Sequence, residues 1–542
     1  MFINLSEIPG QKNLMLDYLY EFNNVEKYYL KNFRDEETIE HHLLIASERK
    51  LLHRQKLVEI IKTQYKNYSP SQLTKKNINS LLSNKTLAVV TAQQLGLFGG
   101  PLNYLYKIIT AIKLTSQLKE KYEEFNFVPV FWIEGEDHGL ENANKIYTYT
   151  KDNQIKKVEY SGAINANENL ISVGDIVLES SIDDSINNLF SLLKKTEYTN
   201  ELRELLKDTF MEGKTFTEAF RKLLFYLFDE YGLIIFDFNL GETKSLAREV
   251  FTETVTNWEA LSLLAIQRSA RLEAEYHVQL KIHPVNLYIF KNGQRHRLEP
   301  HEKGFKMGTK RKILSEAELK EIIANSPERL SPDVFLRPIV QDFILPTAIT
   351  VAGPNEINYF PQIIPYYEYF GIESPILFPR AFVTLNENYL QKKIDLYKLK
   401  YQDLFLLDEK ELTTKILSSD PNSHISKIFE ETEHEIDFTL DRLKEKLFSI
   451  DPNLTKDAKE VRDGILKLMA ILRTKAESSN SSKLQAVIRH SKLLKHQFLP
   501  NNKLQEDVIN FAYFANKYGL DILKLIFNEI SINNFEEQII NL

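Results

Sequence analysis

Five short apolar runs, rich in β-branched and aromatic residues, constrain the fold of this chain more than any other feature. They alternate with longer segments that have helical periodicity, and this alternation is typical of a mostly parallel α/β sheet. The predicted strands cover residues 87–91, 127–133, 233–238, 344–353 and 374–379. We therefore predict an α/β fold whose core is a mostly parallel sheet.

The segments between these strands predict the domain organisation. Residues 140–225 and about 255–330 are too long for simple crossovers, so we interpret them as subdomains inserted into a core at 86–385. Residues 1–85 are predicted to be a helical segment packed on that core. Within it, residues 30–66 contain no glycine or proline and should form a helix.

Residues 386–499 have a different composition, with one glycine (Gly464) and two prolines (Pro421 and Pro452). Both prolines lie where helices are expected to break. Apolar residues on both sides of Pro452 are spaced by threes and fours, which predicts antiparallel coiled-coil helices. We expect a compact helical hairpin with an apolar side available for a dimer contact. Residues 500–542 should form helices that return to the core.

The composition excludes several classes of function. A net charge of −7 over 542 residues argues against a chain-wide nucleic-acid or membrane surface. The chain has no cysteine, which excludes disulfides, thiolate zinc sites and cysteine nucleophiles. Glu7 and Pro9 interrupt the position of a signal-peptide core, and no run of about 18 apolar residues is present. We expect a cytoplasmic protein without nucleic-acid or membrane partners.

A glycine-bearing turn separates the first predicted strand from a helix. Gly96, Gly99 and Gly100 lie within five positions, although the chain has only 18 glycines. Such a turn can point backbone N–H groups at an anion, and Pro101 suits a first helical turn. Lys107, two turns further on, could reach back to a phosphate or carboxylate. The spacing matches neither GxGxxG nor a P-loop, so a purely structural turn is the alternative.

Acidic residues follow the second predicted strand. Glu134, Glu136, Asp137 and His138 should lie at the carboxyl edge of the sheet, where ligands bind in open α/β folds. Carboxylates beside an imidazole perturb one another's pKa and supply acid or base chemistry. A Mg²⁺ or Zn²⁺ site and a solvated strand end are the alternatives, and we expect no metal. Asp237, ending the third strand, is a weaker candidate for binding a cofactor ribose or a substrate hydroxyl.

A third segment surrounds the fourth and fifth strands. The Gly353-Pro354 turn should aim Glu356 and Tyr359 across the sheet edge. Arg380 closes the fifth strand, and an arginine can hold a carboxylate with two parallel hydrogen bonds. An ordinary loop with a surface arginine is the alternative reading.

Together these segments resemble a known family. TAQQLGLFGGPLNYLYK, VPVFWIEGEDH, VAGPNEINYF and FPR, in this order and before a helical hairpin, resemble the bacillithiol biosynthesis cysteine-adding enzyme family (cysteine ligases), and LQEDVINFAYFANKYG is similar to its closing motif. The resemblance implies a Rossmann-like, class I nucleotidyltransferase-like core that binds a nucleotide (ATP or ADP), and a coiled coil that supports a homodimer. The implied reaction joins cysteine to glucosaminyl-malate by an amide bond, forming bacillithiol.

The hypothesis assigns a role to each candidate residue. Turn amides and Lys107 would stabilise negative charge, and His138, oriented by Asp137 or Glu136, would take the amine proton. Arg380 and Glu356 would hold charged groups of the substrates. The predicted substrate-binding residues are Gln94, Gly96, Phe98, Gly100, Pro101, Tyr104, Glu134, Gly353, Pro354, Glu356, Tyr359 and Arg380.

Three positions depart from the family pattern, namely Ala92, Gly139 and Asp507. Gly139 stands where an aspartate often follows the histidine, so the role of that acid would fall on Asp137 or Glu136. No lysine loop of the KMSKS type is found. Two alternatives therefore stay open: another class I-like nucleotidyltransferase that makes an acyl-adenylate, and a non-catalytic nucleotide-binding protein.

Overall fold

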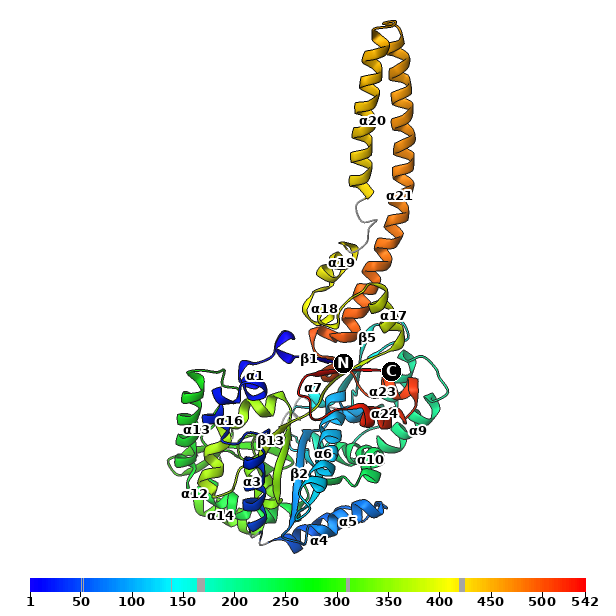
Figure 1. Cartoon of the computed structure of the whole chain (residues 1–542). Coiled ribbons are helices and arrows are strands. Elements are labelled where there is room, and N and C mark those ends of the chain that lie inside the picture. Colours follow the sequence, from blue (N-terminus) through cyan, green and yellow to red (C-terminus); the bar gives the residue numbers. More distant parts are fainter. Residues whose placement is uncertain (50, 52, 138, 163–170, 309–311, 419–424) are drawn as a thin grey trace. The chain divides into compact units, whose positions relative to one another are not determined.

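The computed structural model describes the chain in two compact units (Figure 1). Residues 1–385 with 503–540 form the first unit, and residues 386–502 with 541–542 form the second. The described residues are 1–49, 51, 53–137, 139–162, 171–308, 312–418 and 425–542. His138, one of the predicted catalytic residues, lies outside them. Among the helices of these ranges, none is both long and apolar enough to cross a membrane.

A five-stranded parallel sheet forms the core of the first unit. The strands are β2 (Thr86–Gln94), β3 (Asn126–Glu134), β6 (Ile234–Asp237), β12 (Thr347–Ala352) and β13 (Ile376–Pro379). Every neighbouring pair is parallel, and all five predicted strands are confirmed. Because both faces are covered, the strands are apolar throughout, and Leu87 to Val90 are fully buried.

The strand order is β13-β12-β2-β3-β6. The chain therefore builds outward from β2 in one direction and then returns to add β12 and β13 on the other side, as in Rossmann-like sheets. The switch point lies between β2 and β12. The helices α6 (Leu102–Lys121) and α16 (Pro354–Phe370) begin just after these two strands, so both N-termini lie at the switch point.

The N-terminal segment is helical, but the helix expected over residues 30–66 is interrupted. The helices are α1 (Asn13–Tyr20), α2 (Glu26–Tyr29), α3 (Glu36–Glu48), α4 (Arg54–Gln64) and α5 (Gln72–Ser80). Tertiary hydrogen bonds outweigh helix propensity here. Arg49 is extended and donates to the Asp342 carbonyl, while Arg54 donates to the Leu81 carbonyl at 3.0 Å.

Two long insertions interrupt the sheet. The first contains α7 (Leu140–Ala143), the hairpin β4 (Lys145–Tyr149) and β5 (Ile155–Glu159), α8 (Ser181–Leu192) and α9 (Thr199–Thr209), and α10 (Phe216–Phe228) then leads to β6. After β6 come α11 (Gly241–Lys244), α12 (Arg248–Thr256) and α13 (Trp258–Glu273).

The second insertion contains an antiparallel sheet of order β10-β9-β8-β7-β11. Its elements are β7 (Leu287–Lys291), β8 (Gln294–His301), β9 (Gly304–Met307), β10 (Ile313–Leu314), α14 (Glu316–Asn325) and β11 (Leu330–Pro332). The helix α15 (Arg337–Ile344) then returns the chain to β12.

The C-terminal segment, whose apolar pattern predicts helices, contains short helices and a strand. The elements are α22 (Gln505–Val508), α23 (Ala512–Tyr518), α24 (Ile522–Glu529) and β15 (Glu537–Asn541), which lies between β1 (Phe2–Ile3) and β14 (Phe382–Asn386). Asn510 and Gly519 interrupt the pattern. The Asn510 amide donates to the Tyr147 carbonyl at 2.9 Å, and Gly519 has a φ of 81°.

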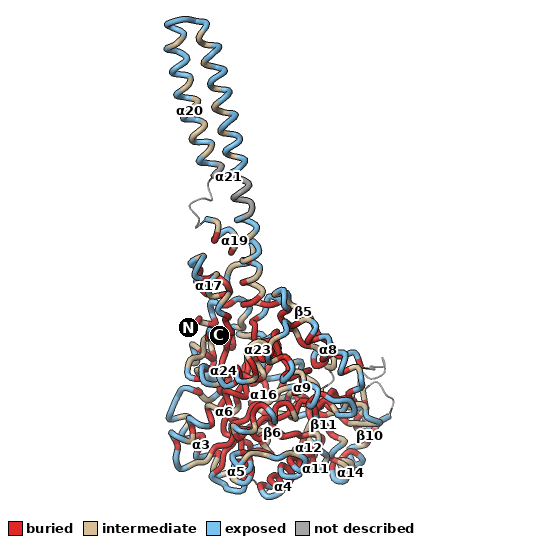
Figure 2. The backbone as a smooth tube through the Cα atoms, turned by 90° about the vertical axis from the view of Figure 1, so that its right-hand side faces the viewer, coloured by how far each residue is buried: buried red, intermediate tan, exposed pale blue. Residues whose placement is uncertain are grey.

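The second unit is helical, as predicted. It comprises α17 (Asn388–Leu396), α18 (Tyr401–Leu406), α19 (Glu409–Ser418), α20 (Ile425–Phe448) and α21 (Leu454–Phe498). Ion pairs fix an antiparallel hairpin, because Arg462 binds Asp437 while Arg473, further along α21, faces Glu430, earlier on α20. With 45 residues, α21 is longer than the helices of the compact hairpin that we expected. Figure 2 shows mostly exposed and intermediate residues along both helices.

Candidate active site

A buried ion pair lies at the switch point of the sheet. Lys107, on α6, is 3 % exposed, and its Nζ donates to the Ala92 carbonyl and to Gln93 Oε1, both at 2.9 Å. The same ammonium group forms an ion pair with Glu356 on α16. The pair therefore joins the helix that follows β2 to the helix that follows β12.

The N-terminal turn of α16 fixes the position of Glu356. Its Oε2 accepts a hydrogen bond from the Gly353 amide at 2.9 Å, so the Glu356 side chain caps the N-terminus of its own helix. Burial alone would raise the pKa of Glu356, but Lys107 and the Gly353 amide hold it below its ordinary value. A Cβ atom on Gly353 would lie 2.9 Å from Glu356 Oε2 and 3.4 Å from Lys107 Cε. A side chain at position 353 would therefore displace the Glu356 carboxylate.

The glycine turn has left-handed backbone at three successive residues. Phe98, Gly99 and Gly100 have φ values of 48°, 90° and 71°. The Gly99 amide donates to the Gly96 carbonyl and the Gly100 amide to that of Leu97. These two amides are therefore used within the turn, and the expectation that they face an anion is wrong for them in this structure.

The C-terminal segment forms hydrogen bonds with the carbonyl groups of this turn. Asn510 Nδ2 donates to the Phe98 carbonyl at 3.0 Å and to the Gly100 carbonyl at 2.5 Å. A Cβ on Gly100 would lie 2.6 Å from the ring of Tyr104, so this glycine is needed for both its φ and its packing. The turn serves to shape the backbone around Tyr104. Pro101 is the N-cap residue of α6, one position before the first turn expected for it.

The acidic residues after β3 contact different parts of the protein. Glu136 is buried, pairs with Lys244 on α11 and accepts a hydrogen bond from Ser331 Oγ at 2.9 Å. Asp137 accepts a hydrogen bond from Gln94 Nε2 at 2.6 Å and lies 3.3 Å from Arg295 of β8. The structure thus brings Asp137 and Gln94 together but gives Glu136 partners of its own.

Glu134 is the acid with the most perturbed environment at this edge. Its carboxylate lies 3.0 Å from Arg337 Nη1 at the start of α15, and its side chain is 8 % exposed. Burial raises the pKa of Glu134 to about 7, although Arg337 acts in the opposite direction. Tyr359, also predicted here, is hydrogen-bonded to Arg337, and burial raises its pKa above the ordinary value.

A cavity of about 340 Å³ opens beside these groups. It is lined by residues that include Gln94, Tyr104, Glu134, Asp137, Asn142 and Arg295. Both signs of charge face it, and burial raises the pKa of the Tyr104 phenol to about 12. The cavity can therefore bind a small molecule that carries ammonium, hydroxyl or carboxylate groups.

Arg380 lies near the ion pair but is engaged by the protein itself. It is 2 % exposed, so the alternative of a surface arginine is wrong. Its Nη2 lies 2.7 Å from Glu506 Oε1 on α22, and its Nη1 donates to the Ala381 carbonyl at 2.8 Å. The carboxylate that this guanidinium holds in the structure belongs to Glu506, not to a substrate.

Several residues of the site were not among the predicted site residues, although Glu506 and Asn510 lie in the closing motif LQEDVINFAYFANKYG. Arg295 comes from the second insertion, Arg337 from the helix before β12, and Asn510 and Glu506 from the C-terminal segment. None lies in the glycine turn, the acidic segment or the Gly-Pro turn. For Arg337, the following Pro338 predicts the start of a helix, but it does not predict that the arginine belongs to a site.

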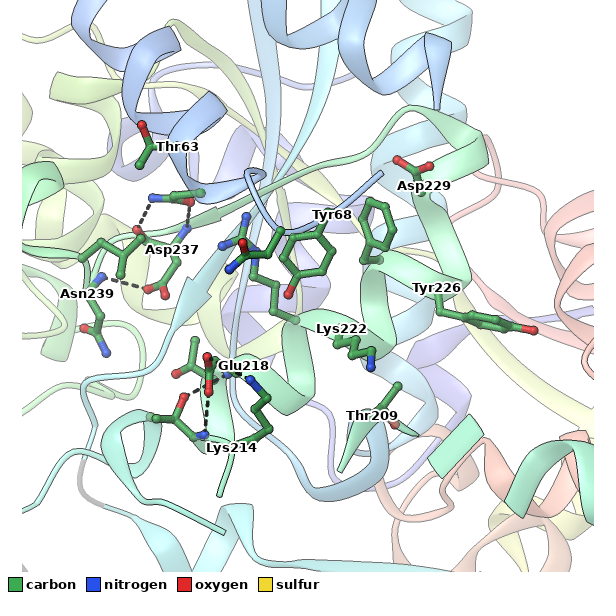
Figure 3. A pocket seen from close by; sticks show the side chains of 18 of the residues that line it. Thr63, Tyr68, Thr209, Lys214, Glu218, Lys222, Tyr226, Asp229, Asp237 and Asn239 are labelled. Atoms are coloured by element: carbon green, nitrogen blue, oxygen red, sulfur yellow. Dashed lines mark hydrogen bonds and ion pairs between the residues drawn. The ribbon is translucent and has the colours of Figure 1, made fainter. Parts of the chain in front are cut away.

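Asp237 lies in a different cavity. It lines a space of about 870 Å³ along α10 (Figure 3). Gly174 lines this cavity while its neighbour Val173 lines the smaller one, and the Gly174 amide donates to the Gly135 carbonyl at 2.8 Å. Thr217 packs against this contact, because a Cβ on Gly174 would lie 2.4 Å from Thr217 Oγ1. The two cavities share no lining residue.

Comparison with known proteins places the chain in a family. Residues 1–381 match the family model for the N-terminal Rossmann-like domain of BshC of bacillithiol biosynthesis, and residues 383–542 match its C-terminal coiled-coil domain. A "Putative cysteine ligase BshC" of Chloroherpeton thalassium is 31% identical, over 95% of this chain and 93% of the relative. Relatives of the same name from Chlorobaculum tepidum (31%; 87% of this chain, 85% of the relative) and Flavobacterium johnsoniae (30%; 88% and 87%) are similar. The chain belongs to the BshC family of bacillithiol biosynthesis.

Proposed function

We propose that this chain is the cysteine ligase of bacillithiol biosynthesis, which joins the carboxyl group of cysteine to the amino group of glucosaminyl-malate. The full-length family match carries this proposal, because both domain models match and relatives over most of the chain bear the ligase name. The 340 Å³ cavity supports it, since acidic and basic groups face a space suited to small charged substrates. A cytoplasmic location is part of the proposal.

The reaction forms one C–N bond while the amine loses a proton and the carboxyl carbon loses an oxygen. A free carboxylate does not react with an amine until that oxygen becomes a leaving group, so we include ATP as the co-substrate that activates it. In the acyl-adenylate form of the reaction, the oxygen leaves with AMP after pyrophosphate is released. The choice between this form and an acyl phosphate is decided by the nucleotide product.

A base must take the proton from the attacking amine. Glu134 fits this role, because its carboxylate lines the cavity and burial raises its pKa to about 7, close to working pH. Arg337 holds the carboxylate in place. His138, the base predicted from the sequence, follows Asp137 directly and stays a candidate for the same proton or for the leaving group.

Lys107 and Glu356 are better suited to positioning than to contact with substrate. Each charged group already has protein partners, and the pair joins the helices that flank the switch point. Asp137, with Gln94 and Arg295 beside it, is the more exposed acid and is placed to bind the substrate ammonium group.

We also propose that the chain forms a homodimer through the hairpin of α20 and α21. Large apolar side chains on it are exposed, including Phe438 at 65% and Leu468 at 69%. Burying apolar surface of this kind against a second copy is favourable by about 25 cal/mol per Å². A Phe438→Glu and Leu468→Glu double variant should be monomeric in light scattering while the wild-type chain is a dimer. A wild-type monomer at micromolar concentration would contradict the proposal.

The ligase is tested with purified chain, cysteine and glucosaminyl-malate, with and without ATP, by mass spectrometry of the thiol product. We expect bacillithiol only when all three compounds are present, together with one equivalent of AMP or ADP. Glu134→Gln should abolish the product, whereas Glu141→Gln, an exposed acid on α7, should not. Absence of product, or pyrophosphate exchange that depends on a different acid, would contradict the proposed function.

A further inference from the structure

The larger cavity, of about 870 Å³, runs along one face of α10 and ends at the carboxyl end of β6. Figure 3 shows Tyr68, Asp237, Glu218 and Lys222 around the same space. Only Asp237 among the residues predicted from the sequence lines it. Its size is in the range of small-molecule sites, and the proposed ligase reaction gives it no role.

An arginine in the wall of this cavity is buried, and the charge of Asp237 acts on it from beyond ion-pair distance. Arg221, on α10, is 7 % exposed, and its guanidinium lies 5.1 Å from the ring centroids of both Tyr65 and Tyr68. Among the described residues, no carboxylate forms an ion pair with it, and its Nη2 has no hydrogen-bond partner. A buried charge without a partner is costly, so an anion supplied by a ligand would offset this cost.

The β6 end of the cavity presents polar groups at neighbouring positions. Gln64 holds the backbone of Asp237 on both sides, accepting from its N–H at 3.0 Å and donating to its carbonyl at 2.8 Å. Asp237 Oδ1 accepts a hydrogen bond from the Asn239 amide at 2.9 Å. Thr217 Oγ1 is buried and has no hydrogen-bond partner within the part of the chain that the structure describes. Because the Thr217 hydroxyl packs against Gly174 and Gly135, the Asp237 carboxylate is the group at this end that suits a ligand with hydroxyl groups.

An aromatic wall lies between these two features. The rings of Tyr68 and Phe225 are 4.8 Å apart and inclined at 58°, and both residues line the cavity. Such rings offer an apolar face next to polar groups. The C–H face of a pyranose ring matches this combination of an apolar wall, hydrogen-bonding groups at one end and a cation at the side.

We propose that this cavity is a second ligand site, and that it binds a monosaccharide carrying a carboxylate or phosphate group, with the anion on Arg221 and ring hydroxyls on Asp237. The site is separate from the 340 Å³ cavity and does not depend on the ligase reaction. A sugar acid and a sugar phosphate share the required chemistry, and the experiment distinguishes them.

Titration calorimetry on the full chain tests the proposal with glucose 6-phosphate and glucuronate as probes. We expect at least one of them to bind at least tenfold more tightly than glucose and than inorganic phosphate, since only the joined ligand reaches both ends. Stronger binding of the phosphate or of the carboxylate identifies the source of the anion. Failure of both probes, equal binding of inorganic phosphate alone, or binding of ATP with neither sugar would overturn the proposal.

Variants place the ligand in the cavity. Arg221→Gln should weaken binding about 10- to 100-fold, since it removes a charged hydrogen bond, and Asp237→Asn should weaken it less. Arg203→Gln is the matched control, because Arg203 is also stacked on a ring, that of Phe190, but does not line the cavity. Binding unchanged in both cavity variants would overturn the assignment. If one variant does not fold, the other still decides.

The ligase assay gives an independent readout on the same samples. If the chain binds the anionic sugar but makes no bacillithiol, the proposed function is contradicted and the second site is supported. If it makes bacillithiol but binds neither probe, the second site is contradicted and the proposed function is supported.

Discussion

The two cavities at the carboxyl edge of the sheet differ in how their charges are satisfied. Around the smaller cavity, Lys107 pairs with Glu356 and Arg337 pairs with Glu134. Along the larger cavity, Arg221 is buried to a similar degree as Lys107, yet no described carboxylate forms an ion pair with it. The first region is preorganised by its own residues, whereas the second is completed by a ligand.

The comparison suggests a distinction between catalytic and binding surfaces: buried charges are ion-paired within the protein at the first and await a ligand at the second. Preorganised pairs hold reacting groups in place without reorganisation during the reaction. An unpaired buried cation costs folding free energy, and an anion that binds to it offsets this cost. The following predictions test whether the two cavities behave in these opposite ways.

The largest expected effect is on catalysis at the smaller cavity. Glu134→Gln should lower kcat/KM at least 100-fold at pH 8, because a general base contributes about 10²- to 10⁴-fold. In the wild-type chain the rate should fall about tenfold per pH unit below about pH 7, as the carboxylate that faces Arg337, Asp137, Lys107 and Glu356 becomes protonated. Steady-state kinetics from pH 5.5 to 9 measure both.

The control for this prediction is Glu141→Gln, which changes an exposed acid on α7 and should keep the wild-type profile. A Glu134→Gln variant that retained the same acidic limb would show that another group, such as His138, supplies the base.

The next effect concerns the stability of the paired region. Lys107→Met should lower the free energy of unfolding by about 3–5 kcal/mol, because it leaves Glu356 buried without its cation. Urea unfolding measures the loss. Lys119→Met, on the same helix and half-buried, should change little. A Lys107→Met and Glu356→Met double variant should be more stable than the Lys107→Met variant. Equal losses of unfolding free energy in Lys107→Met, Lys119→Met and the double variant would refute the pairing.

A smaller effect is expected at the glycine turn that shapes the cavity. Gly100→Ala should cost about 1–3 kcal/mol, since φ is 71° and the new methyl group meets the Tyr104 ring. Gly213→Ala is a matched control, with a φ of 81° but no atom within 4 Å of the added Cβ. It isolates backbone strain, so an equal loss in both variants would mean that the Tyr104 contact contributes nothing.

The smallest effect is expected at the unpaired cation. Arg221→Gln should change the free energy of unfolding by less than about 1 kcal/mol, or stabilise the chain, because no ion pair is lost. The same urea experiment applies. A loss comparable to that of Lys107→Met would show that Arg221 is already satisfied by the protein, and the contrast between the cavities would fail.

The sequence predicted the parallel sheet, and it placed several candidate residues at the edge where a cavity lies, for a physical reason. Buried parallel strands read as continuous apolar runs, and residues at their carboxyl ends must meet at one edge. Glu134, Gln94 and Tyr104 were therefore placed at one cavity. The partners of these residues were not predictable, because Arg295 and Arg337 come from segments whose local pattern only specifies a strand and a helix start.

Side-chain direction accounts for the other differences. Glu136 and Asp137 are neighbours in sequence but bind Lys244 and Arg295 respectively. Arg380 ends a strand at the correct edge, yet Glu506, distant in the sequence, takes its guanidinium. Such pairings depend on tertiary contacts that no spacing within a motif encodes.

Hydrogen-exchange mass spectrometry tests the separation of the two cavities most directly. Glucosaminyl-malate with cysteine should protect amides in residues 94–104 and 139–143, and the tighter-binding of the two anionic sugars should protect residues 214–226. Protection of the same segment by both, or of 214–226 by the ligase substrates alone, would contradict the account.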